Sequence, residues 1–163
     1  MFKTLIAATL MSACAAAHAA EGTFTIKSLT PETALTAARA ALEQCRKQGY
    51  QVAVAVVDRA GITQVFLRDR FAGPHTVDVA VNKAWTAISF RQPTAAFAAE
   101  TQPGKAMSAL RNHPRVLAAG GGLVIEGGGS LFGGIGVSGG PGGDADDACA
   151  KAGLKAIADA LEF

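Results

Sequence analysis

The segment Gly133–Asp144, GGIGVSGGPGGD, decides the fold of this 163-residue chain. Glycine at this density lets a strand approach neighbouring backbone closely and permits positive φ, so the segment predicts a tight junction between a strand and a helix. Apolar residues at helical spacing from Ala148 to Leu161 indicate the helix. Asp144 stands where a side chain can accept hydrogen bonds from the first helical N–H groups. We therefore expect a strand over 130–138 and a helix over 144–160.

Further elements follow from apolar periodicity on the N-terminal side of this junction. Strands that arrive as hairpins are antiparallel, because each parallel pairing needs a crossover of about a dozen residues. The order of elements therefore predicts an α+β fold, with a single antiparallel sheet of about five strands flanked by helices in one domain. The expected strands are 23–27, 51–57, 62–67, 123–126 and 130–138, and the expected helices are 31–48, 77–90, 95–100, 105–111 and 144–160.

The first 19 residues have the pattern of a signal peptide. Lys3 precedes an apolar run over 5–17, and Ala17-His18-Ala19 forms a small-x-small cleavage site. The run is too short to span a bilayer. We expect a periplasmic or secreted protein without a transmembrane segment, in which residues 20–27 lead into the main domain over 28–163. Lipoprotein processing at Cys14 is the less favoured alternative, because Met11 replaces the leucine that a lipobox prefers.

Charge and cysteine content restrict the function classes. The chain has 15 basic and 13 acidic side chains with no run of like charge, which argues against a nucleic-acid partner. Two cysteines remain after processing, Cys45 and Cys149. They could form a disulfide in an oxidising compartment, but a bridge needs Cα atoms within about 7 Å, which sequence alone does not establish. We favour two free, buried thiols.

Five stretches of the sequence resemble the GlcG/HbpS-like family of haem-binding and haem-degrading proteins. This resemblance implies a profilin-like layered arrangement and a homo-oligomer. It also implies haem or a related tetrapyrrole as ligand, and it leaves open whether haem is degraded as well as bound. The stretches are Val54–Gly61 (VAVVDRAG), Arg68–Thr76 (RDRFAGPHT), Asn82–Ala87 (NKAWTA), Gly120–Ile125 (GGGLVI) and Gly133–Asp144.

Two histidines remain as nitrogen donors once His18 leaves with the signal peptide. His75 follows Pro74 at the start of the second long helix, and the resemblance places this segment beside the ligand. We therefore predict His75 as the ligand of a haem iron. His113, before Pro114 in an irregular region, is the second candidate.

Cationic and aromatic side chains could complete a haem site. Arg68, Arg70 and Lys83 are candidates for pairing with propionates. The alternative is a salt bridge to Asp69, Asp78 or Glu100, and for Arg70 this interpretation is at least as good. The apolar walls could come from aromatic residues that could equally be core: Phe66, Phe71, Trp85 and Phe90.

Other function classes compete with haem binding. Gly136–Gly140 matches the G-x-S-x-G pattern of serine hydrolases, but five residues separate Ser138 from Asp144, whereas a nucleophile elbow needs a helix directly after the serine. A non-catalytic accessory or chaperone-like module for a periplasmic redox enzyme is one alternative, and a sensor or carrier of a small organic acid is another. Two histidines alone do not close a four-ligand zinc site.

Overall fold

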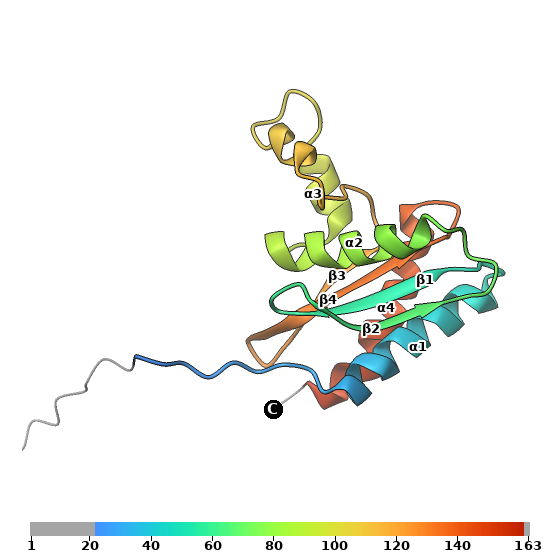
Figure 1. Cartoon of the computed structure of the whole chain (residues 1–163), viewed down its shortest axis with the longest axis vertical. Helices are drawn as coiled ribbons and strands as arrows, with labels where there is room; N and C mark the ends of the chain where they lie inside the picture. Colours follow the sequence, from blue (N-terminus) through green and yellow to red (C-terminus); the bar gives the residue numbers. More distant parts are fainter. Residues whose placement is uncertain (1–21, 162–163) are drawn as a thin grey trace, which may run out of the picture.

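The computed structural model describes residues 22–161. It shows an α+β fold in which four strands form one sheet and helices lie on both of its faces (Figure 1). The strands are β1 (Ala53–Asp58), β2 (Thr63–Arg68), β3 (Gly122–Gly127) and β4 (Ser130–Ser138). The α-helices are α1 (Pro31–Lys47), α2 (Thr76–Phe90), α3 (Thr94–Glu100) and α4 (Gly143–Ile157), and two short 3-10 helices are η1 (Ser108–Asn112) and η2 (Ala158–Ala160).

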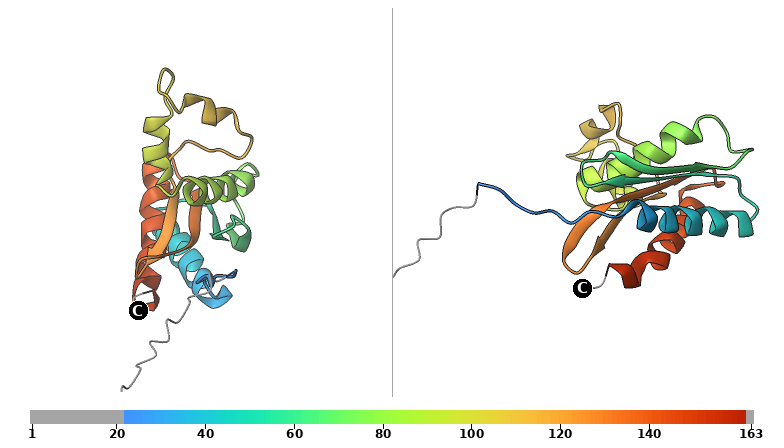
Figure 2. Two further views of the ribbon diagram at one scale, coloured as in Figure 1. Left: turned by 90° about the vertical axis from the view of Figure 1, so that its left-hand side faces the viewer. Right: turned by 60° about the horizontal axis from the view of Figure 1, so that its bottom comes forward.

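The sheet has the order β2-β1-β4-β3, and every neighbouring pair is antiparallel. Helices α1 and α4 cover one face, α2 crosses the other, and α3 with the segment after it projects beyond α2 (Figures 1 and 2). Two apolar clusters fill the layers. The larger lies between α1, α4 and the sheet, and the smaller lies between α2 and the sheet.

The glycines of β4 set the distance between α2 and the sheet. A Cβ on Gly136 would lie 2.1 Å from the carbonyl oxygen of Ala80, and one on Gly134 would lie 2.7 Å from that of Ala84. The backbone of α2 therefore rests directly on β4, with alanine on the helix opposite glycine on the strand. This contact confirms that the glycine-rich segment serves close packing. Ser138 is buried at the end of β4, and α4 begins only at Gly143, so there is no nucleophile elbow.

The prediction of a fifth strand over 23–27 is wrong. The segment has no strand assignment, and its apolar side chains Phe24 and Ile26 are 87% and 51% exposed. Alternation over so few residues does not make a strand unless a sheet edge is there to pair with it. The expected helix over 105–111 is also shorter, because only the 3-10 helix Ser108–Asn112 forms there. Residues 1–19, the predicted signal peptide, lie outside the described residues.

A disulfide joins Cys45 on α1 to Cys149 on α4, with Cα atoms 5.5 Å apart. Our preference for free thiols is therefore wrong. Both residues are buried as the sequence suggested, but α1 and α4 pack side by side on the same face of the sheet, which brings the two positions within bridging distance.

The capping role predicted for Asp144 is also wrong. Gly142 is the N-cap of α4, and no side chain caps this helix end. The carboxylate of Asp146, in the first turn of α4, instead accepts a hydrogen bond from the backbone N–H of Gly140 at 2.9 Å. This bond runs back to the glycine turn and holds it against the helix.

Candidate functional site

The loop between β2 and α2 carries the predicted haem ligand, and buried polar contacts fix its shape. Asp69 is buried at the start of the loop and forms an ion pair with Arg46 of α1. Arg68 donates to the carbonyl of Ala72 at 2.6 Å, and the hydroxyl of Thr76 donates to the carbonyl of Gly73 at 2.6 Å. The hydrogen bond that Arg46 donates to Asp69, together with the negative charge of that carboxylate, raises the pKa of the Arg46 guanidinium, although burial acts in the opposite direction.

His75 is exposed at the N-cap of α2, and its side chain makes no cap hydrogen bond. Its ring folds over Gly73. A Cβ on Gly73 would lie 2.7 Å from Cε1 and 2.9 Å from Nδ1 of the ring, but 3.8 Å from Nε2. The absence of a side chain at residue 73 thus makes room for the imidazole, and Nε2 is the ring nitrogen farther from Gly73.

Apolar and cationic side chains flank His75 along the chain. Phe71 is 79% exposed and Val77 is 37% exposed, both large values for apolar residues. The guanidinium of Arg70 lies 5.9 Å from the centre of the Phe71 ring. Within residues 22–161, neither Arg68 nor Arg70 forms an ion pair, because Asp69 pairs with Arg46 instead. Both arginines are exposed, so their free N–H groups can reach an anion.

Lys83 belongs to a different environment from His75. It is buried, its Nζ atom lies 2.6 Å from the carboxylate of Asp146, and it also donates to the carbonyl of Val137 at 3.0 Å. The lysine therefore ties α2 to α4 and to the end of β4. With its charge paired in the interior, it has no free donor directed at solvent for a propionate.

His113 is placed apart from His75, against Trp85. Their ring centroids are 5.2 Å apart with planes 8° from parallel, and the guanidinium of Arg115 lies 4.7 Å from the Trp85 ring. The Nδ1 atom of His113 accepts the backbone N–H of Arg115 at 3.2 Å, so the proton of the neutral ring is on Nε2. A protonated Nε2 has no lone pair for iron, so His113 would have to leave this contact to ligate a metal.

Of the four aromatic residues considered as apolar walls, only Phe71 is exposed beside the candidate ligand. Phe66 packs against the smaller apolar cluster, and Phe90 contacts Phe97 with ring centroids 4.4 Å apart. Trp85 is half-buried, stacked on His113 and close to Gly61, and it belongs to neither apolar cluster of the core.

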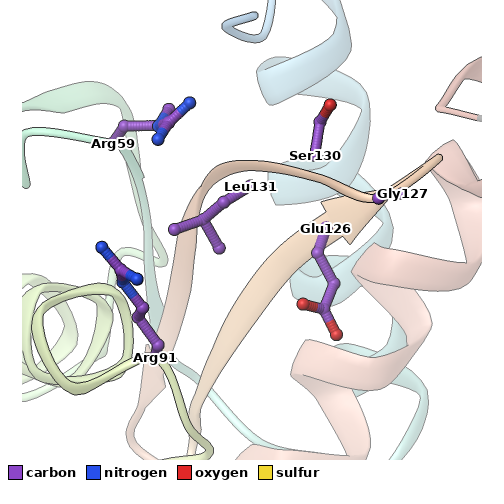
Figure 3. A pocket seen from close by; sticks show the side chains of 7 residues that line it. Arg59, Arg91, Glu126, Gly127, Ser130 and Leu131 are labelled. Carbon is purple, nitrogen blue, oxygen red and sulfur yellow. The ribbon is translucent and has the colours of Figure 1, made fainter. Parts of the chain in front are cut away.

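A separate cleft of about 660 Å³ lies beyond the other end of α2 (Figure 3). Two arginines, Arg59 and Arg91, stand on one side of it, and Glu126 stands on the other. Sequence reasoning did not identify this cleft, although Arg59 lies within the family-like stretch 54–61 and Arg91 ends α2. Among the described residues, no three His, Cys, Asp or Glu side chains form a group that could hold a metal ion. Over the same range, no helix is both long and apolar enough to cross a bilayer.

Comparison with known proteins agrees with the fold and with the sequence resemblance. A model of the family described as "Haem degrading protein HbpS-like" matches residues 29–155. The corrinoid adenosyltransferase PduO of Salmonella typhimurium is 34% identical over 132 residues, which are 80% of this chain and 39% of the relative. The PduO of Citrobacter freundii matches over 31% of its own length, so this chain spans well under half of these enzymes.

Two solved structures place the fold within the same group. The structure of a double mutant of Streptomyces reticuli HbpS superimposes with a TM-score of 0.79 at 37% identity, covering 94% of this chain and 99% of HbpS. A PduOC:haem complex superimposes with a TM-score of 0.75 at 30% identity, covering 80% of this chain and 96% of PduOC. The chain therefore belongs to the HbpS-like family of haem-degrading proteins.

Proposed function

We propose that this protein binds haem at the loop between β2 and α2, with His75 as the iron ligand. One observation carries the proposal. His75 is an exposed imidazole whose side chain makes no hydrogen bond within the described part of the chain, and its Nε2 atom is the ring nitrogen farther from Gly73. Neutral imidazole nitrogen is a common ligand of haem iron. The haem complex of the related PduOC supports the choice of ligand.

The residues around His75 fit a porphyrin. Exposed Phe71 and Val77 offer apolar contact to a macrocycle, and Arg68 and Arg70 offer its propionates guanidinium groups that have no carboxylate partner within the described residues. Arginine suits this role because its planar fork can bind a carboxylate through two hydrogen bonds. We leave Lys83 and His113 out of the proposed binding set, because one is paired in the interior and the other is stacked on Trp85.

Bound haem would supply redox-active iron, which is the chemistry that haem degradation requires. The chain's own contribution is to hold and orient. Gly73 leaves room for the imidazole, the hydroxyl of Thr76 holds the carbonyl of Gly73, and Asp69 anchors the start of the loop to α1. Degradation of the bound haem also needs an oxidant and a reductant. In the experiment described below, both are added only after haem binding has been measured.

We also propose that the protein forms a homo-oligomer and that it is exported. The His75 surface is open on one side, because the exposed Phe71 and Val77 lie on an uncovered loop and first helical turn, so a second copy of the chain could cover the outer face of the porphyrin. The disulfide between Cys45 and Cys149 supports a periplasmic or secreted location, since such bonds persist in oxidising compartments.

A haemin titration followed by absorbance tests the proposal. Wild-type protein should give a saturable Soret band, and His75→Ala should shift that band because the axial ligand sets the electronic structure of the iron. Arg68→Ala should weaken binding by roughly ten- to a hundredfold and leave the position of the band nearly unchanged. His113→Ala is the matched control, and ascorbate with oxygen then reports any degradation as loss of the Soret band.

Two other outcomes of the titration would contradict parts of the proposal. If His113→Ala moves the Soret band and His75→Ala does not, the ligand assignment is wrong. If wild-type protein gives no saturable haem spectrum, haem binding is wrong for this chain, and the non-catalytic accessory module becomes the better hypothesis.

A further inference from the structure

The cleft at the C-terminal end of α2 is separate from the proposed haem site. It lies where the β1–β2 turn, the end of α2 and the β3–β4 hairpin meet, and has a volume of about 660 Å³ (Figure 3). Arg91 follows His75 by sixteen positions along α2, which corresponds to about 24 Å along the helix axis. The volume of the cleft falls within the range of small-molecule binding sites.

The two arginines of the cleft have no carboxylate partner in the described structure. The ion pairs within residues 22–161 join Arg46 to Asp69 and Lys83 to Asp146. The carboxylate nearest to Arg59 in sequence, Asp58, accepts hydrogen bonds from the N–H groups of Ala60 and Ile62 and thereby fixes the β1–β2 turn. Arg59 is thus presented on an ordered turn with its guanidinium free.

Arg91 has an unusual backbone conformation. It is the C-cap of α2 with φ 53° and ψ 41°, and it is the only residue other than glycine with positive φ between positions 22 and 161. Glycine takes this conformation at no steric cost, whereas a residue with a Cβ is strained there. A strained position that carries a guanidinium into a cleft is typical of a residue present for its side chain.

The other lining groups define what the arginines could bind. Arg59 and Arg91 lie on the same side of the Leu131 side chain, and Glu126 lies beyond it on the far side (Figure 3). Leu131 can contact a short carbon chain, and Ser130 adds a hydroxyl that donates or accepts. Glu126 would repel an anionic group placed beyond Leu131. The negatively charged groups of a ligand should therefore lie on the side of the cleft that carries Arg59 and Arg91.

We propose that this cleft binds a short dicarboxylic acid, with Arg59 and Arg91 each pairing with one carboxylate. Two separate guanidinium forks balance two carboxylates in charge and match their planar geometry. The site does not depend on haem binding at His75, because no residue is shared between the two.

Calorimetric titration of the full chain at low ionic strength tests the proposal. The probes are malonate, succinate and glutarate, with butyrate as the one-carboxylate comparison. At least one dicarboxylate should bind saturably and at least tenfold more tightly than butyrate or sulfate. Arg59→Gln should weaken that binding by roughly ten- to a hundredfold. Arg39→Gln, a matched change at an exposed arginine of α1, should have no effect.

Arg91→Gly separates loss of binding from loss of folding. Glycine relieves the strained backbone, so this variant should keep or raise the melting temperature while it loses dicarboxylate affinity as Arg59→Gln does. The proposal is overturned if wild-type protein binds no dicarboxylate, if sulfate binds as tightly, or if Arg39→Gln weakens binding as much as the cleft variants do.

A haemin titration of the same variants identifies the source of the carboxylates. Unchanged haemin affinity in Arg59→Gln and Arg91→Gly supports a free small acid. If both variants lose haemin affinity and wild-type protein binds no dicarboxylate, the arginines hold porphyrin propionates and the small-acid proposal is wrong. Dicarboxylate binding by a protein that gives no haem spectrum would leave this inference intact and contradict only haem binding at His75.

Discussion

The Nζ atom of Lys83 lies 2.6 Å from a carboxylate oxygen of Asp146, in an interior where the two side chains are only 4% and 5% exposed. The pair joins α2 to α4 across the end of β4. Lys83 also donates to the carbonyl of Val137, and Asp146 also accepts from Gly140, so four segments meet at one ion pair. This arrangement fixes the glycine-rich junction and is structural in character.

Removal of the lysine charge should therefore destabilise the fold and leave haem binding unchanged. Lys83→Met leaves the Asp146 carboxylate buried without a cation, a change that typically costs about 3–5 kcal/mol of unfolding free energy. Urea unfolding measures the loss. The double variant Lys83→Met/Asp146→Asn should recover part of it, because the amide stays neutral and can still accept from Gly140. If the Lys83→Met protein has unchanged stability but a weakened affinity for haemin, Lys83 is one of the residues that bind haem, and its exclusion here is wrong.

The disulfide should contribute strongly to stability because it closes a loop between residues 104 positions apart. Cross-links of this span restrict the unfolded chain, and their removal typically costs about 2–5 kcal/mol. The double variant Cys45→Ala/Cys149→Ala should lose this amount in urea unfolding, and adding a reductant should destabilise the wild-type protein but not the variant. Two free thiols in unreduced wild-type protein, counted by mass after alkylation, would contradict the bridge.

Much of the fold could be predicted because local patterns determine it. The hairpins β1–β2 and β3–β4, the Pro31 start of α1 and the helix after the glycine-rich segment each follow from periodicity and turn residues nearby. The disulfide and the absence of a strand over 23–27 depend on which segments meet in space, and the sequence contains no local signal for either.

The candidate site was predictable to a smaller extent. The resemblance located the segment that contains His75, and its exposure agrees with a loop at a helix start. That Lys83 is paired with Asp146, 63 positions away, and that His113 is stacked on Trp85 are long-range relationships. The cleft between Arg59 and Arg91 was missed for the same reason, since its walls come from three separate elements.

The close approach of α2 to β4 gives a prediction with a matched control. In Gly136→Ala the new Cβ would lie 2.1 Å from the carbonyl oxygen of Ala80, and neither backbone can yield easily. We expect a loss of roughly 2 kcal/mol or more in unfolding free energy, at the upper end of overpacking effects. Gly142→Ala has no atom within 4 Å of the new methyl and an extended φ of −177°, so only the preference for glycine over alanine at an N-cap acts there, and the loss should stay below about 1 kcal/mol. Equal stability of the two variants would contradict direct backbone packing.

The ring position of His75 can be tested without altering the histidine itself. In Gly73→Ala the added methyl would come within 2.7 Å of Cε1 of the imidazole, so the ring must turn away. Because an exposed side chain can rotate at low cost, the midpoint of urea unfolding should stay close to that of the wild type. The Soret band of the haemin complex should nevertheless move toward that of His75→Ala, since the iron ligand has been displaced. Gly142→Ala again serves as the control. A Gly73→Ala protein with the wild-type spectrum, alongside a shifted His75→Ala spectrum, would show that His75 ligates iron from a different ring position than the one over Gly73.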